Sequence, residues 1–316
     1  MIGFVFYPTV WACHLIMDIR YILGVATAIF CGISMQAGII IQKKAVNNMP
    51  AEERAQHFMR TLIKNPKWLG GLVLEYGLGT AAFLVAQSLI GPALVPGLMA
   101  SGLIVLAIGS VKIIGEALSP SEYAGIALMI AGISLLGLSE LDISAAVVRD
   151  RLAAPGTASR IAVLTIGLFI LWGITHLGSF WHARRRGIIM AFSNGFPFAI
   201  SNFWVSPLLA VFAIVMTGNG NLKQITLFVL ASAILVGCNV FGVWQTNEAF
   251  RFAQASNVIP VQQISVQITP ILFYFYVYAL KSPKTMSGAF IVIGIACILL
   301  AAFLLGRRQS ELEMRK

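Results

Sequence analysis

Hydrophobic and polar positions divide this chain into long apolar stretches separated by shorter polar connections. A helix needs about 20 mainly apolar residues to cross roughly 30 Å of membrane hydrocarbon. We expect nine membrane-spanning helices, at residues 21–41, 68–90, 93–114, 120–138, 161–180, 188–217, 225–249, 255–280 and 285–305. The sixth contains Pro197 and Pro207, so it is either one kinked, tilted helix or a span followed by a re-entrant segment.

The composition agrees with this pattern. Hydrophobic residues make up 58% of the chain and charged residues 11%, which excludes a soluble domain built around one core. We therefore expect an all-α, polytopic membrane protein. Residues 1–20 contain an apolar stretch that is short for a span, and we interpret them as an N-terminal tail or as residues before a true start at Met17.

The positive charges predict the orientation. Lysine and arginine gather in segment 42–67, at Lys112, at 184–186, at Arg251 and in the tail 307–316, and a nine-span count places all of these on one side. Such an excess marks the cytoplasmic side. We expect a multi-pass cell-membrane protein with a cytoplasmic C-terminus. Its net charge of +10 then serves topology and contact with anionic lipid, not nucleic-acid binding, which would concentrate the charge in a soluble module.

The second half of the chain repeats the first. Pro96 corresponds to Pro260 at an offset of 164, while Pro120 corresponds to Pro283 at an offset of 163. With four spans per repeat and one connecting span, the second repeat begins on the opposite side of the membrane, so the repeats are inverted. The expected organisation is a first repeat at 21–139, a linker with a connecting helix at 140–187, a second repeat at 188–306 and a basic tail at 307–316. Inverted repeats place a substrate site near the midplane and support alternating access.

Polar residues inside the predicted spans are the candidates for that site, because each is costly in lipid and tends to face the bundle interior. The substrate-path candidates are Glu75, Gln36, Asn194, Asn202, Asn239, Gln245, Asn247, Glu248, Gln263 and Gln267. The competing interpretation is that single amides only hold helices together. Glu75 is either a cation or proton site or an interfacial carboxylate.

Two further features concern helix ends. Pro96 and Pro260 are candidate helix breaks, because they occupy matching places in the two repeats and paired interruptions indicate a binding site. Lys112 and Glu116 are four residues apart, which predicts an ion pair on one helix face.

Several short motifs resemble a known family. They are Gly32-Ile33-Ser34, Gln42-Lys43-Lys44, Trp68-Leu69-Gly70, Pro92-Ala93-Leu94-Val95-Pro96, Glu116-Ala117-Leu118 and Asn247-Glu248-Ala249-Phe250 followed by Pro260. Together they resemble the NIPA-like magnesium transporters of the drug/metabolite transporter (EamA-like) superfamily. The resemblance implies a drug/metabolite transporter-like fold and magnesium or another divalent cation as substrate. Departures from the family pattern include Glu248, which stands where the family has lysine.

Two substrate classes remain open. Magnesium prefers carboxylate oxygens and retained water, so Glu75 and Glu248 are the candidate metal ligands. An amide-lined cavity suits a small organic solute equally well.

Other chemistry has no visible basis in the sequence. The four cysteines are dispersed without a CxxC motif, and no HExxH, P-loop or nucleophile-elbow motif is present. We expect a secondary transporter or permease that is not an enzyme and has no cofactor, with membrane lipid and a small substrate as partners and homodimerisation possible. The alternative from another class is a non-transporting membrane scaffold.

Overall fold

A computed structural model describes residues 8–50, 52, 58–90, 95–141, 145–182 and 185–314 of the protein. Within these residues, nine helices are long and apolar enough to cross a membrane. They are Ile19–Asn47, Pro66–Gln87, Val95–Ile114, Pro120–Leu138, Thr157–Trp181, Arg186–Met216, Leu222–Phe252, Ala255–Val277 and Ser287–Leu305. The number of predicted spans is confirmed for the described part of the chain, and their positions agree to within a few residues. The protein is a multi-pass, all-α membrane protein.

The first half of the chain supplies four of these spans. Its elements are α1 (Pro8–Asn47), α3 (Phe58–Ile63), α4 (Pro66–Leu72), the π-helix η1 (Val73–Gly79), α5 (Thr80–Ile90), α6 (Val95–Met99), α7 (Gly102–Gly109), the π-helix η2 (Ser110–Ile114) and α8 (Pro120–Leu138). The second span is formed by α4, η1 and α5, and the third by α6, α7 and η2. Residues 8–20 and the first span form one helix, so the part of the predicted N-terminal tail from residue 8 onward is helical; residues 1–7 lie outside the described part.

The second half follows a short connecting element. Its helices are α9 (Ala145–Ala153), α10 (Thr157–Trp181), α11 (Arg186–Met216), α12 (Leu222–Phe252), α13 (Ala255–Leu272), the π-helix η4 (Phe273–Val277) and α14 (Ser287–Met314). Helix α11 contains both Pro197 and Pro207 without interruption, so the sixth span is one helix. Helix α9 was not anticipated. It packs on α11, with Val148 fully buried and Arg149 Nε donating to the Ala210 carbonyl at 3.3 Å.

Local sequence signals account for several helix starts. Asn65 caps α4 by accepting from the backbone N–H groups of Lys67 and Trp68, and Pro66 follows at the first helical position. Ser119 begins α8 with a capping box in which the Glu122 carboxylate accepts from the Ser119 backbone N–H at 2.7 Å. These caps fix where the second and fourth spans begin.

The third span of each predicted repeat ends in a π-helix: η2 follows α7, and η4 follows α13. Residues 110 and 114 bound η2, and residues 273 and 277 bound η4, so both elements are separated by 163 positions (273 − 110 and 277 − 114). A backbone reversal with positive φ follows each, at Gly115 (φ 82°) and Ala279 (φ 48°). This offset of 163 residues equals the one between Pro120 and Pro283 in the sequence.

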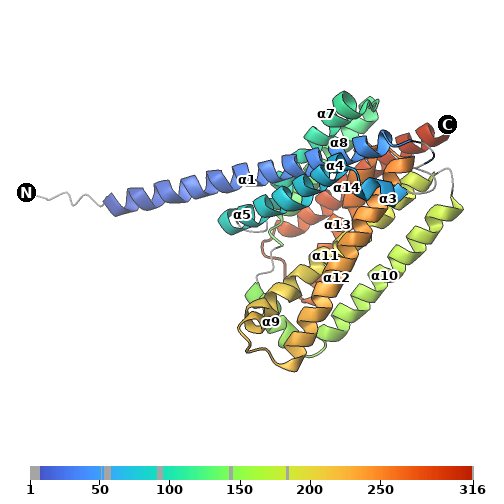
Figure 1. The fold of residues 1–316 in the computed structure, drawn as a ribbon. Helices are drawn as coiled ribbons and strands as arrows, with labels where there is room; N and C mark the ends of the chain where they lie inside the picture. Colours follow the sequence, from blue (N-terminus) through green and yellow to red (C-terminus); the bar gives the residue numbers. More distant parts are fainter. Residues whose placement is uncertain are drawn as a thin grey trace, which may run out of the picture.

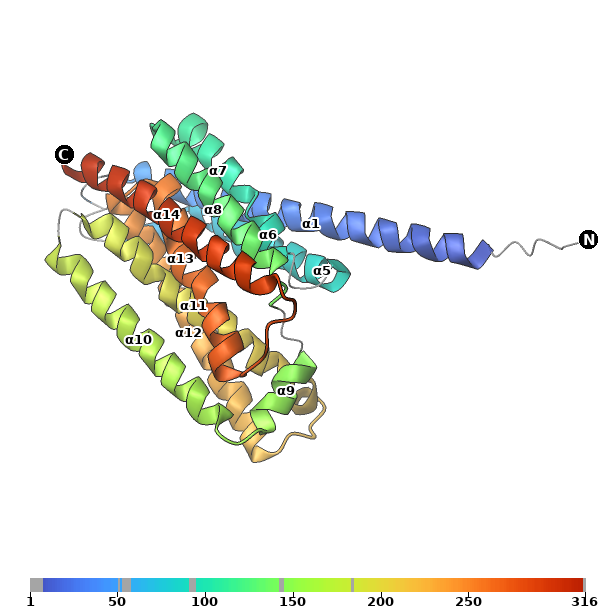
Figure 2. The same ribbon diagram turned by 180° about the vertical axis from the view of Figure 1, so that it is seen from behind.

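Helices α8 and α14, the last of each half, lie side by side (Figures 1 and 2). A Cβ atom added to Gly132 would lie 2.8 Å from the Gly294 carbonyl oxygen, and one added to Gly294 would lie 3.0 Å from the Gly132 oxygen. Gly125, which precedes Gly132 on α8, lies against Leu305, which follows Gly294 on α14. The two helices therefore run antiparallel. Small residues allow this close backbone approach inside a membrane.

The two halves are close at one end of the bundle and separate toward the other (Figure 1). The C-terminal ends of α1 and α12 and the start of α13 lie at the close end, where the larger hydrophobic cluster collects residues from both halves. At the other end α5 and α9 lie well apart, and α1 extends beyond the rest of the molecule (Figures 1 and 2).

Candidate substrate path between the two halves

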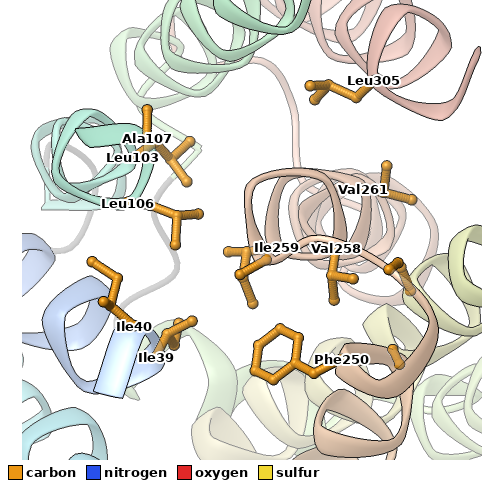
Figure 3. Packing of buried hydrophobic residues seen from close by; sticks show 14 of the residues in the cluster. Ile39, Ile40, Leu103, Leu106, Ala107, Phe250, Val258, Ile259, Val261 and Leu305 are labelled. Carbon is orange, nitrogen blue, oxygen red and sulfur yellow. The ribbon is translucent and has the colours of Figure 1, made fainter. Parts of the chain in front are cut away.

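An apolar plug closes the interface at the end where the halves meet. Figure 3 shows side chains from α1, α7, α12 and α13 directed toward a common centre. All are less than 9% exposed; the plug comprises Ile39, Ile40, Leu103, Leu106, Phe250, Val258 and Ile259. Close-packed side chains leave no room for water. The plug is therefore a buried apolar contact between the halves at this end.

Lys43 lies one turn beyond Ile39 and Ile40 on α1 and binds the C-terminal end of α12. Its Nζ donates to the carbonyls of Phe250 and Ala253, the latter at 2.7 Å, and it lies 5.5 Å from the centre of the Phe250 ring. The last carbonyls of a helix have no partners inside it and carry partial negative charge. Lys43 supplies these carbonyls with both a hydrogen-bond donor and a positive charge, and it links the first half to the second.

Two carboxylates from the first half bind the N-terminal end of α13. Glu116 accepts from the backbone N–H groups of Ala255 at 2.8 Å and Ser256 at 3.3 Å, and from the Ser256 hydroxyl at 2.9 Å. Glu122 accepts from Asn257 Nδ2 at 2.9 Å. Negative groups are favourable at a helix N-terminus. We refer to Lys43, Glu116 and Glu122 with these partners as the clasp.

The clasp was not predicted, and it corrects one expectation. Helix η2 ends at Gly115 with φ 82°, so Lys112 and Glu116 do not share a helix face; Lys112 is exposed and Glu116 binds α13. Lys43 and Glu122 were not among the candidates. Their signals in the sequence were a lysine near the end of an apolar span and a glutamate three residues after Ser119.

Asn247, a predicted path residue, forms another link between the halves at the closed end. Its Oδ1 accepts from Trp68 Nε1 on α4 at 3.0 Å, and its Nδ2 donates to the Val243 carbonyl at 2.8 Å. Both side chains are buried. Asn247 therefore fixes α12 against the second span.

Amides follow the plug residues along α1 and along α13, in the direction away from the clasp. Gln36 precedes Ile39 and Ile40 by about one turn of α1, and Gln263 follows Ile259 by about one turn of α13, so these amides continue the faces that form the plug. Gln267 Nε2 donates to Gln263 Oε1 at 3.2 Å. Gln36 is 8% exposed and its Oε1 has no hydrogen-bond partner in the described structure. We call Gln36, Gln263 and Gln267 the amide layer.

Glu75 lies where η1 packs against α1. Gln42 Nε2 of α1 donates a hydrogen bond to its carboxylate. A Cβ atom added to Gly38 would lie 2.6 Å from the Gly71 oxygen, so the two backbones approach closely beside this pair. π-Helical segments inside α-helices are frequent at functional sites. The half-buried Glu75 carboxylate is thus held on the flank of α1 by a neutral partner.

Asn194 joins three helices of the second half. Its Nδ2 donates to the Thr246 hydroxyl on α12 and to Gln262 Oε1 on α13, the latter at 3.1 Å. Its buried Oδ1 has no partner among the described atoms. Asn194 therefore keeps one acceptor available deep in the second half.

Three other predicted amides have different surroundings. Gln245 accepts from Trp172 Nε1 at 2.9 Å, donates to the Ser193 hydroxyl at 3.0 Å and lies 3.0 Å from His176 Nδ1. Asn239 donates to the Ser201 hydroxyl and to the Leu235 carbonyl. These bonds hold α10, α11 and α12 together, as the competing interpretation of the amides proposed. Asn202 is exposed on α11.

The two candidate metal ligands have separate partners. Both Glu248 oxygens accept from Arg251, at 2.8 and 3.1 Å, and the Arg251 guanidinium lies 4.9 Å from the Phe58 ring centre. Glu75 binds Gln42. In the described part of the chain, no group of three or more His, Cys, Asp or Glu side chains could hold a metal ion. A site formed by Glu75 and Glu248 stays a prediction.

The paired prolines occupy different positions. Pro96 lies in the first turn of α6, where its missing N–H is tolerated, and the third span is interrupted four residues later at Ala100 and Ser101. Pro260 lies inside α13, which continues to Leu272, so the expected break there is corrected. A buried helix can lose one backbone hydrogen bond at proline because neighbouring groups compensate.

No protein-family model, curated protein or solved structure matches this chain.

Proposed function

We propose that the protein is a secondary transporter that works by alternating access between two inverted repeats. One observation carries this proposal: the buried apolar plug and the clasp join the halves at one end of the interface, and Gln36, whose Oε1 has no partner in the described structure, follows the plug along α1. A buried polar atom without a partner calls for an explanation such as water or a ligand.

The pseudo-symmetry of the two halves supports the inverted repeats. The π-helices η2 and η4 recur at the 163-residue offset of the sequence repeat. The fourth spans, α8 and α14, pack antiparallel with Gly132 and Gly294 in reciprocal contact. An antiparallel pair of corresponding helices is the relation that a two-fold axis in the membrane plane produces.

The orientation of the proposed closed state follows from charge. The clasp lies at the same end as Lys44, Lys64, Lys67 and Arg251, which the positive-inside rule places in the cytoplasm. The structure then corresponds to an outward-facing conformation. Opening would separate Lys43, Glu116 and Glu122 from the helix termini that they bind. Water can then form hydrogen bonds with the separated groups, so the clasp is suited to reversible closure.

The geometry favours a small polar organic solute as substrate. The amide layer offers neutral donors and acceptors, whereas Glu248 is bound through both oxygens by Arg251. Magnesium or another divalent cation is the second candidate. It is supported by the Glu75 carboxylate inside a span and by the resemblance to NIPA-like transporters within the drug/metabolite transporter superfamily.

Side-specific thiol labelling tests alternating access. The four native cysteines are replaced by alanine, Gln36→Cys or Gln263→Cys is introduced, and the protein is reconstituted in vesicles of known orientation. We expect labelling mainly from the side opposite the clasp. Lys43→Met in the same background should increase labelling from the clasp side. Simultaneous access from both sides would indicate a channel, and access from neither side in any variant would support a scaffold.

Flux measurements separate the two substrate classes. Proteoliposomes are loaded with a magnesium indicator in one series and exposed to a panel of radiolabelled amino acids and other small polar solutes in another. We expect saturable uptake of an organic solute that Gln36→Leu abolishes. Saturable magnesium uptake that is lost in Glu75→Gln would instead establish the cation as substrate.

A further inference from the structure

A large groove lies on the flank of the first half, between α1, α4 and α7–η2. Its volume is about 1220 Å³, which exceeds the roughly 300–1,000 Å³ of pockets for drug-sized ligands. Apolar side chains form most of its wall, including Ile40, Ile41, Leu74, Val105, Ile108 and Ile113. Ile108 and Ile113 are 51% and 50% exposed, so the wall faces the surroundings of the bundle.

Three lysines lie at one end of this groove. Lys44 is in the last turn of α1, and Lys64 and Lys67 flank the start of α4. All three are exposed, and in the described part of the chain no carboxylate lies within ion-pair distance of them. Among the described residues that line the groove, none is an aspartate or a glutamate. The site therefore presents positive charge at the membrane surface and an apolar wall toward the hydrocarbon.

We propose that this groove binds one anionic phospholipid, with the headgroup phosphate at Lys44, Lys64 and Lys67 and the acyl chains along the apolar wall. Charge complementarity selects an anionic headgroup, because basic pockets between membrane helices bind such lipids. The depth of the wall selects a lipid over a soluble phosphate, because a soluble anion leaves Ile41, Ile108 and Leu74 uncovered. This inference does not depend on the proposed transport activity.

Native mass spectrometry of the full chain in detergent tests the lysines. The protein is titrated with phosphatidylglycerol or with phosphatidylcholine of the same acyl chains. Each lysine near a membrane surface contributes about fivefold in affinity, so Lys44→Gln/Lys64→Gln/Lys67→Gln should weaken phosphatidylglycerol binding on the order of a hundredfold. The matched control, Arg160→Gln/Lys223→Gln/Lys281→Gln, removes three exposed charges elsewhere and should bind like the wild type.

A second variant tests the apolar wall. Gly70 lines the groove, and a Cβ atom added there meets no heavy atom within 4 Å, so Gly70→Leu fills the groove without a backbone clash. We expect Gly70→Leu to lose phosphatidylglycerol while its unfolding temperature without added lipid stays that of the wild type. Competition by glycerol phosphate, which has no acyl chains, should fail.

Three outcomes would overturn the proposal. Equal retention of phosphatidylcholine and phosphatidylglycerol would show that the charge of the headgroup does not select the lipid. Undiminished binding in the triple lysine variant would place the lipid elsewhere. Competition by glycerol phosphate at the affinity of the lipid would reduce the site to a headgroup anion site.

Discussion

The clasp and Gln36 of the amide layer are both buried and polar, but their hydrogen bonding differs. In the clasp, Lys43, Glu116 and Glu122 bind the free groups of two helix termini. In the amide layer, Gln36 Oε1 has no partner among the described atoms. Satisfied groups stabilise one arrangement of the helices, whereas an unsatisfied group is available to a ligand or water. The clasp residues therefore hold one arrangement of the halves, whereas Gln36 is the residue that we propose faces a substrate.

The largest stability effect is expected at Glu122. Its fully buried carboxylate accepts from the Ser119 backbone and from Asn257, so Glu122→Ala leaves donors unpaired. We expect the free energy of unfolding in detergent to fall by about 3 kcal/mol, since each buried donor left without a partner costs about 1–3 kcal/mol. Glu140→Ala is the control, because Glu140 pairs with Lys284 at the surface and exposed pairs contribute about 0–1 kcal/mol. Equal losses in the two variants would refute the structural role of the clasp.

Lys43→Met should weaken the closed end by about 2 kcal/mol, since hydrogen bonds from charged donors are worth about 1.5–3 kcal/mol. Electron–electron distance measurements between spin labels at Asn48 and His182, both exposed at the clasp end, should show a longer, broader distribution. The neighbouring Lys44→Met is the control and should leave the distribution unchanged. An unaltered distribution in Lys43→Met would mean that the plug alone closes this end.

The link between Trp68 and Asn247 should contribute about 1 kcal/mol, as one neutral hydrogen bond does. A double-mutant cycle with Trp68→Phe and Asn247→Ala measures this coupling from unfolding free energies. The cycle of Trp172→Phe with Asn247→Ala is the control, because Trp172 bonds to Gln245 instead. Coupling of the same size in both cycles would show that the effect is not specific to the link.

The smallest stability effect is expected at Gln36. Its Oε1 has no partner, so Gln36→Leu should change the free energy of unfolding by less than about 0.5 kcal/mol while it removes substrate flux. Gln245→Leu provides the contrast, because Gln245 has partners on two other helices and its loss should cost about 1–3 kcal/mol. A large destabilisation in Gln36→Leu would assign it to the structural group.

Sequence reasoning placed the spans well because hydropathy is a local property. The fourth span, 120–138, agrees with the structure at both ends, and Ser119 and Pro120 cap its start. The prediction for the interior of the path was less accurate. Gln245 and Gln36 are both amides inside apolar segments, yet one is fully bonded within the second half and the other is not.

The sequence by itself determined the class of the protein, its apolar spans and the distribution of positive charge. The tertiary structure decided which polar residues hold the halves together. Lys43 reaches carbonyls 207 and 210 positions away, and Trp68 reaches Asn247 across 179 positions. Burial in lipid follows from each segment's own transfer free energy, but the partner of a polar side chain depends on which helices pack together. That choice depends on small-residue contacts such as Gly132 with Gly294, which no single segment encodes.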